Sequence, residues 1–505
     1  MKNVLEYLEY NAERCGSKIA ASDTDKKYTY TQLLNTSKRI GSRLAETGAK
    51  NRPVALYLEK SVDLLSAMLG TVYSGNFYVV VDLEMPVDRM NKIFQTLRPC
   101  ALVTDTAHCD RIKAADYNCN LIDLEDALLS EIREDRLSEI RSAQIDTDPL
   151  YANFTSGSTG VPKGIAVCHR SVIDFIEVFT KTFAFSETDI IANQAPFDFD
   201  VSVKDIYSAL KMGAQLVIVP RRLFSAPAPL LDYLCENKVT VMTWAVSALC
   251  LISTLHGLDY KTPETVKKIL FSGEVMPYKH LMNWQQHLPE AMLVNLYGPT
   301  EITCNCTYHI LESGRDYSGG IPIGRPFDNE DVFLLDDKNE LITESGKAGE
   351  ICVRGTALAL GYYASPEQTA KHFVQNPLNS FYPDIIYRTG DLGTYNENGE
   401  LVFSGRKDFQ IKYMGHRIEL EEIEHSMAAI DGVERCVCIF DEKKSKLKGY
   451  YIGTIDKAQL HTIMKSSLPV FMVPGILRQV ESMPLTKNGK IDRKKLQEAE
   501  VAKRK

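Results

Sequence analysis

The stretch Thr155-Ser-Gly-Ser-Thr-Gly-Val-Pro-Lys-Gly164 decides the fold, and it directly follows the apolar run Leu150-Tyr-Ala-Asn-Phe154. Its three glycines let backbone N–H groups approach an anion closely, and its hydroxyl side chains supply further donors. Lys163 adds a positive charge. The stretch therefore predicts a phosphate-binding loop after a strand. It is not a Walker A loop, because Lys163 is followed by Gly164 instead of Ser or Thr. A flexible linker is the alternative, but linkers rarely carry Pro-Lys-Gly beside a strand.

Outside this loop, apolar β-branched runs alternate with amphipathic segments. The expected helices include 62–73 and 203–212. The runs predicted as strands are Val54–Leu58, Phe77–Val81, Ala101–Thr104, Gln215–Pro220, Thr240–Thr243 and Lys268–Phe271. This alternation is typical of βαβ units in a layered α/β protein.

The pattern changes after about Glu330, where short strands are separated by Gly, Asn and Asp turns, as in the hairpin expected at 395–405. A last unit has a helix predicted at 420–429 and a strand at 435–440. The fold class is therefore α/β: a large layered N-terminal domain (1–407), with sheets flanked by helices, and a small mobile α+β C-terminal domain (408–505).

Composition excludes several classes of function. The chain has 505 residues, which is too long for one core. Its net charge of −8 gives no general field for nucleic acid or an anionic membrane. No apolar run approaches the length of a membrane span, and the N-terminus does not read as a signal peptide. The 12 cysteines include no CxxC and read as buried thiols, which favours the cytoplasm.

The phosphate loop closely resembles that of the adenylate-forming superfamily, which contains acyl-CoA synthetases, luciferases and amino-acid adenylation domains. The similarity covers about residues 28–495, and the amino-acid branch fits best, with stand-alone D-alanine–carrier-protein ligases most similar. Six other motifs agree in order: Tyr28–Leu33, Tyr297–Glu301, Gly349–Gly355, Tyr387–Leu392, Gly405–Asp408 and Asn488–Arg493. The stretches closest to the D-alanine ligases are Phe199–Tyr207, Phe271–Pro277 and Asp408–Lys412.

The resemblance implies an ATP site with Mg²⁺ at Glu301, and catalytic roles for Thr155, Lys163, Glu301 and Lys490. It implies that Asp391 accepts the ribose hydroxyls. Tyr297 is flat enough to stack on adenine. The expected nucleotide-binding residues are Thr155, Ser156, Gly157, Ser158, Thr159, Gly160, Gly273, Glu274, Asn295, Tyr297, Thr300, Asp391, Arg406 and Lys490.

The small domain is expected to work in two orientations. In the family, the lysine at Lys490 enters the site for the adenylation step and stabilises the charge that develops there, an effect of roughly 3–4 kcal/mol in comparable sites. Thioester formation uses another orientation, turned about the hinge at Asp408. Gly415 then faces the tunnel for the thiol, where a side chain would block the passage.

Asp200 indicates an amino-acid substrate, because it stands where the family binds the α-ammonium group, and a buried cation needs a partner. Its alternative role is an N-cap of the following helix. The remaining pocket positions carried across from the family are Val201, Lys204, Thr243, Leu270, Ser272, Leu296, Cys304 and Asn305, with Lys490.

The substrate's side chain stays open. Asp200 and Val201 with Leu270, Ser272 and Leu296 resemble serine-activating pockets, so a small polar residue is favoured over alanine, glycine or an acidic residue. Two positions depart from the family patterns: Ser272 replaces a cysteine of D-alanine ligases, and Lys204 replaces an aromatic residue of serine pockets. Lys204 either pairs with Asp200 on one helix face or meets an acidic substrate.

The expected acceptor is the phosphopantetheine thiol of a separate carrier protein, since the chain contains no attachment-site motif for that group. Free coenzyme A is the alternative acceptor. A nucleotide-binding regulatory protein without turnover is a further alternative, which the presence of Lys490, Glu301 and Asp391 disfavours.

Overall fold

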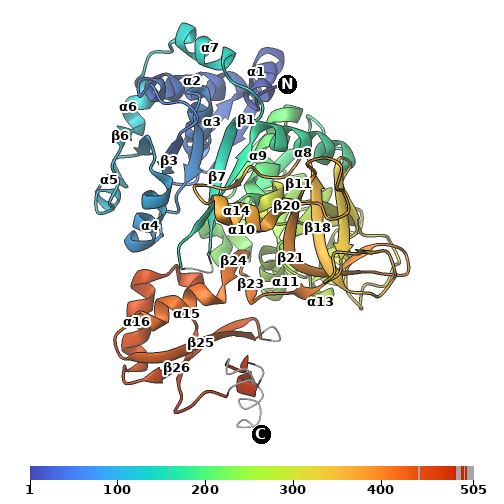
Figure 1. Ribbon diagram of the computed structural model, residues 1–505. Coiled ribbons are helices and arrows are strands. Elements are labelled where there is room, and N and C mark those ends of the chain that lie inside the picture. Colours follow the sequence, from blue (N-terminus) through green and yellow to red (C-terminus); the bar gives the residue numbers. More distant parts are fainter. Residues whose placement is uncertain (158–159, 442–443, 485–490, 494, 498–505) are drawn as a thin grey trace.

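The structure is a computed structural model that describes the chain except residues 158–159, 442–443, 485–490, 494 and 498–505 (Figure 1). Two large sheets form its main body. In the described part of the chain, the first has nine strands in the order β15 (Arg325–Pro326), β14 (Thr307–Ile310), β13 (Met292–Tyr297), β12 (Lys268–Ser272), β11 (Val241–Ala245), β9 (Ile190–Asn193), β10 (Gln215–Ile218), β1 (Ile19–Ser22) and β2 (Lys27–Thr29).

The second sheet has seven strands among the described residues. Their order is β19 (Gly361–Tyr362), β8 (Lys163–Cys168), β7 (Pro149–Thr155), β4 (Phe77–Val80), β3 (Pro53–Tyr57), β5 (Ala101–Thr104) and β6 (Asn120–Asp123). β3 is buried at every position, as expected of a strand covered on both faces. All six strands predicted from apolar runs are confirmed, with ends shifted by at most two residues.

Helices cover both sheets. Those before the phosphate loop are α1 (Leu5–Cys15), α2 (Tyr30–Ala45), α3 (Val62–Tyr73), α4 (Val87–Leu97), α5 (Cys109–Ile112), α6 (Leu124–Leu129) and α7 (Glu134–Ser142). Those after it are α8 (His169–Thr182), α9 (Val201–Met212), η1 (Arg221–Ser225), α10 (Pro227–Glu236), α11 (Val246–Thr254), α12 (Gly257–Tyr260), α13 (Tyr278–His287), η2 (Thr300–Ile302) and α14 (Pro366–His372), where η marks a 3₁₀ helix. The predicted helix 62–73 matches α3, and 203–212 forms most of α9.

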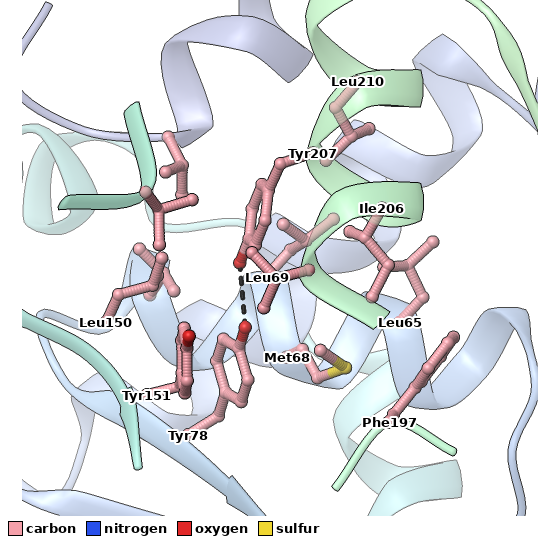
Figure 2. Packing of buried hydrophobic residues seen from close by; sticks show 14 of the residues in the cluster. Leu65, Met68, Leu69, Tyr78, Leu150, Tyr151, Phe197, Ile206, Tyr207 and Leu210 are labelled. Carbon is pink, nitrogen blue, oxygen red and sulfur yellow. Dashed lines mark hydrogen bonds between the residues drawn. The ribbon is translucent and has the colours of Figure 1, made fainter. Parts of the chain in front are cut away.

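The largest buried cluster joins the two sheets through α2, α3, α8 and α9. Figure 2 shows its centre, where Tyr207 of α9 and Tyr78 of β4 share a hydrogen bond of 3.0 Å between their hydroxyl groups. Met68 and Leu69 of α3 pack around them. This packing fixes α9, whose first turns carry Asp200 and Lys204, in the rigid interior of the protein.

A third sheet contains β17 (Leu341–Ile342), β16 (Glu330–Leu335), β18 (Gly349–Gly355), β21 (Ile385–Tyr395), β20 (Phe373–Gln375) and β22 (Leu401–Arg406). β21 and β22 are antiparallel, which confirms the predicted hairpin. The turn between them closes on a hydrogen bond from the Gly399 N–H to the Asn396 carbonyl.

The last elements form a smaller unit, drawn in orange and red in Figure 1. It has its own buried cluster, and no helix among the described residues of the chain is long and apolar enough to span a membrane. Its elements are β23 (Gln410–Tyr413), β24 (His416–Glu419), α15 (Leu420–Ala428), β25 (Val433–Asp441), β26 (Lys446–Gly453), α16 (Lys457–Ser467), η3 (Val470–Met472) and β27 (Ile476–Gln479). The α/β class with a small α+β unit is confirmed, whereas the boundary at 407/408 stays a prediction.

Candidate active site

The phosphate loop connects two antiparallel strands, with Thr155 at the end of β7 paired to Lys163 at the start of β8. A Cβ on Gly157 would lie 2.1 Å from the carbonyl oxygen of Val161, so glycine is required there. The Thr155 hydroxyl is buried and has no hydrogen-bond partner in the described part of the chain. A buried polar atom of this kind indicates a ligand that completes the site. Ser158 and Thr159 lie outside the described residues.

Glu301 lies in η2, fully buried, and faces two polar side chains. Arg417 of β24 donates to its two carboxylate oxygens at 2.8 and 3.0 Å, and the Tyr362 hydroxyl donates at 2.7 Å. Burial alone would raise the pKa of Glu301, but the Arg417 charge and the Tyr362 hydrogen bond lower it to about 2. Glu301 is therefore a permanent anion that demands a cation.

Mg²⁺ fits this carboxylate only if other ligands come from a substrate. Among the described residues, no three His, Cys, Asp or Glu side chains gather into a metal-binding group. Mg²⁺ is commonly held by one or two carboxylates together with phosphate oxygens and water. Glu301 beside the phosphate loop matches that arrangement, and a cation there would neutralise charge on the phosphates.

Asp391 of β21 is held by two neighbours. It accepts a hydrogen bond of 2.6 Å from the Tyr297 hydroxyl and pairs with Arg406 at the end of β22. Arg406 also pairs with Asp408, at 2.6 and 2.8 Å. The predicted ribose ligand and the predicted hinge residue are therefore joined through one guanidinium group. Stacking of adenine on Tyr297 stays a prediction.

Asp200 stands at the start of α9, but its side chain makes no capping hydrogen bond, so the N-cap interpretation is wrong. The residue already has helical backbone angles, and its carboxylate accepts a hydrogen bond from Thr300. Desolvation raises the pKa of Asp200, while the Thr300 hydrogen bond and the Lys204 charge oppose the rise. A desolvated carboxylate gains from a cationic partner, as an α-ammonium group would supply.

Lys204, one turn further along α9, is buried with a different set of partners. Its ammonium group donates to Asn305 Oδ1 at 2.9 Å and lies 3.5 Å from Ser272 Oγ. In the described residues no carboxylate lies within ion-pair distance of it, so the predicted pair with Asp200 is wrong. Asp205, the next carboxylate on the helix, bonds Asn193 and Thr243 instead.

Lys204 and Ser272 lie at the carboxyl ends of parallel strands β9, β11, β12 and β13, where α/β proteins commonly bind ligands. Thr303 and Cys304 both have positive φ in the turn before β14. Gly298 permits this turn, since a Cβ there would lie 2.5 Å from the Asn305 Cα. The predicted pocket residues gathered here are Asp200, Val201, Lys204, Thr243, Leu270, Ser272, Leu296, Cys304 and Asn305.

Two predicted nucleotide-binding residues have partners within the protein. Glu274 accepts a hydrogen bond of 2.8 Å from the Gly415 N–H, and Asn295 donates to the Pro322 carbonyl at 2.9 Å. Gly273 has positive φ and open space around it, and Gly160 also has positive φ. The predicted catalytic residue Lys490 lies outside the described residues.

Sequence reasoning missed the charged residues with which the small unit touches the site. Arg417, Glu419 and Glu422 contact Glu301, Lys163 and the Gly157 N–H, respectively. Their only sequence signal was the run of charges Arg417-Ile-Glu-Leu-Glu-Glu422 directly after Gly415.

A model of the AMP-binding enzyme family matches residues 8–363, which is more than half of the chain. The chain belongs to the AMP-binding enzyme family. Zwittermicin A synthase ZmaJ from Bacillus cereus is 31% identical to this AMP-binding enzyme over 98% of the chain and 94% of its own length. Surfactin synthase subunit 1 from Bacillus subtilis is 30% identical over 98% of the chain, but the chain spans only 14% of that protein.

A solved structure agrees with these relatives. Holo-PA1221, described as a nonribosomal peptide synthetase protein with adenylation and PCP domains, superposes on this AMP-binding enzyme with a TM-score of 0.81 at 25% identity. The match covers 99% of this chain and 84% of that one. The AMP-binding enzyme therefore has the fold of the adenylation domains of nonribosomal peptide synthetases, and it belongs to a family of adenylate-forming ligases.

Proposed function

We propose that this protein activates a small amino acid with ATP as its aminoacyl-AMP, releases pyrophosphate, and transfers the aminoacyl group to the phosphopantetheine thiol of a separate carrier protein. The observation that carries the proposal is Asp200: a desolvated carboxylate beside Thr300 and Glu301, with no cation within ion-pair distance among the residues that the structure describes. A carboxylic acid without an amine would leave that charge unmatched.

ATP and Mg²⁺ are the proposed cofactors. The phosphate loop supplies donors for the phosphates, the Thr155 hydroxyl has no protein partner among the described residues, and Glu301 offers a buried carboxylate for the cation. Asp391 and Arg406 are the proposed ribose contacts. Bound there, the cation would neutralise phosphate charge while Lys163 and the loop hold the phosphates in place.

The small unit is proposed to turn about Asp408 between two half-reactions, with the domain boundary at 407/408. Its orientation here supports this, since the Gly415 N–H contacts Glu274, and a Cβ on Gly415 would lie 3.7 Å from the Ala245 Cβ. This is the side of the site where we propose that the thiol arrives.

The carrier protein is proposed as the acceptor because relatives of this fold, such as PA1221, contain a PCP domain in the same protein. Free coenzyme A remains the alternative acceptor. Because the reaction uses ATP and amino acids and no nucleic acid or membrane, we place it in the cytoplasm. Amino-acid-dependent exchange of labelled pyrophosphate into ATP tests the first half of the proposal.

Lys204 decides which side chain the pocket accepts. We propose a small neutral residue such as serine, since Asn305 and Ser272 already hold the Lys204 ammonium, and Leu270 and Leu296 offer no polar support for a second carboxylate. An acidic substrate is the alternative, and the lack of an ion-pair partner for Lys204 among the described residues favours it. Alanine or glycine is the third candidate.

Lys204→Met is therefore expected to leave the preferred amino acid unchanged and to raise turnover with alanine, because it removes a desolvated charge from the pocket. Exchange is measured with serine, both alanine isomers, aspartate and glutamate. Lys211→Met, in the last turn of the same helix, is the control. A neutral substrate would be contradicted if the wild type preferred an acidic residue and if exchange with that residue fell by about two orders of magnitude in Lys204→Met but not in Lys211→Met.

A further inference from the structure

The segment from Arg417 to Glu422, which joins β24 to α15, lies directly on the phosphate loop and on Glu301. We call it the Arg417–Glu422 segment. It brings one cation and two carboxylates to groups that belong to the large part of the protein. Each of these charges meets a group of opposite sign or a hydrogen-bond donor.

The cation of the segment meets Glu301. The Arg417 guanidinium donates to both Glu301 oxygens, at 2.8 and 3.0 Å, and both side chains are largely buried. A guanidinium group stays protonated in proteins. A full positive charge therefore occupies the carboxylate that we assign to Mg²⁺.

The carboxylates of the segment meet the phosphate loop. Glu422 Oε2 accepts the Gly157 N–H at 3.1 Å, and Glu419 Oε1 lies 3.3 Å from Lys163 Nζ. The Ser156 hydroxyl donates to the Arg417 carbonyl at 2.7 Å and accepts from the Glu419 N–H at 3.1 Å. Three donors that we assign to phosphate oxygens thus bind oxygens of the protein instead.

Arg89 of α4 closes this arrangement from the other side. It pairs with Glu422 Oε1, and both side chains are buried. An incidental contact between two domains would bury apolar surface, because burying charges costs solvation that their attraction only partly repays. A set of matched buried charges gives a specific fit with little net stability, which suits a contact that must break in every cycle.

We propose that the Arg417–Glu422 segment is a built-in substitute for magnesium pyrophosphate: Arg417 takes the place of the cation on Glu301, and Glu419 and Glu422 take the place of phosphate oxygens on the loop. This rests on the proposed function, because pyrophosphate is the by-product of adenylation. Because Arg417 donates to both oxygens of Glu301, it competes with Mg²⁺ for that carboxylate, and the small unit adopts this orientation only after magnesium pyrophosphate has left. Magnesium pyrophosphate and the segment then compete by mass action.

A disulfide trap reports this orientation without any measurement of activity. In Gly415→Cys combined with Ala245→Cys, the two Cβ atoms are placed 3.7 Å apart, within the range for a disulfide. Peptide mapping identifies the bond among the 12 native cysteines. We expect saturating magnesium pyrophosphate to slow its formation by about tenfold or more, and magnesium chloride with sulfate to leave the rate unchanged.

Calorimetric titration with magnesium pyrophosphate provides the second measurement, on the protein with its native cysteines. Arg417→Ala and Glu422→Gln are expected to bind it about tenfold more tightly than wild type, because the competing contacts are lost. Arg417→Lys should restore part of the competition. The matched controls are Arg435→Ala, an exposed cation of β25, and Glu421→Gln, a carboxylate of the same segment with no contact to the described residues of the loop. Both should bind as wild type does.

The proposal would be overturned if magnesium pyrophosphate bound with equal affinity to Arg417→Ala, Glu422→Gln and Glu421→Gln. It would also be overturned if saturating magnesium pyrophosphate left the rate of disulfide formation unchanged. A failure of the proposed function looks different: magnesium pyrophosphate would then bind neither wild type nor any variant. If magnesium pyrophosphate binds but does not compete with the Arg417–Glu422 segment, only the proposal that the segment substitutes for it is rejected, and the proposed function stands.

Discussion

Asp200→Ala is expected to lower the selection of the preferred amino acid over its deamino analogue by roughly 2–5 kcal/mol, the usual range for removing one member of a buried charge pair. Without the carboxylate, the α-ammonium group would be desolvated with no partner, while Thr300 would lose its acceptor. Exchange rates with serine and with the matching hydroxy acid, measured on wild type and variant, give this difference directly.

Asp198→Ala is the matched control, because Asp198 lies in the same loop two residues before Asp200, and burial raises its pKa to about 7. It should keep the amino-acid preference. If Asp200→Ala favours the amino acid over its deamino analogue to the same extent as wild type, Asp200 does not bind the substrate.

Lys490→Ala is expected to reduce adenylation by about 10²–10³-fold, because it removes an electrostatic contact to the reacting carboxylate and phosphate. Transfer from pre-made aminoacyl-AMP to a thiol should remain close to wild type. In the orientation described here, the small unit places Arg417 and Gly415 at the site, and both are far from Lys490 in the sequence. The two half-reactions are measured separately.

Running the transfer assay with a phosphopantetheinylated carrier protein and with coenzyme A compares the two acceptors in the same experiment. An equal loss in adenylation and transfer would show that the small unit does not use two orientations. Lys495→Ala, a basic residue five positions further on, serves as the control.

Local patterns were enough to predict the elements that hold the site. The apolar run of β3 and the buried face of α9 are encoded over a few residues each, so strands, helices and the loop at 155–164 follow from the sequence. The pocket positions came from the family resemblance, and the structure carries several of them, such as Ser272, at strand ends.

Long-range partners were not predictable in the same way. Arg417 and Glu301 are 116 residues apart, and their contact depends on how the small unit is turned. Lys204 and Asn305 are 101 residues apart, so helical spacing suggested Asp200 as the partner of Lys204, and the local rule gave the wrong answer. The N-cap prediction failed similarly, because Thr300 of η2, which is distant in sequence, binds the Asp200 carboxylate.

The most direct test of the central claim is exchange of labelled pyrophosphate into ATP by the wild-type protein, with Mg²⁺ and a panel of amino acids, their deamino analogues, fatty acids and aryl acids. The account predicts robust exchange with one or a few small amino acids, dependent on Mg²⁺, and none with acids that lack an α-amine, because these leave Asp200 charged and unpaired. Robust exchange with a simple carboxylic acid and none with any amino acid would contradict it.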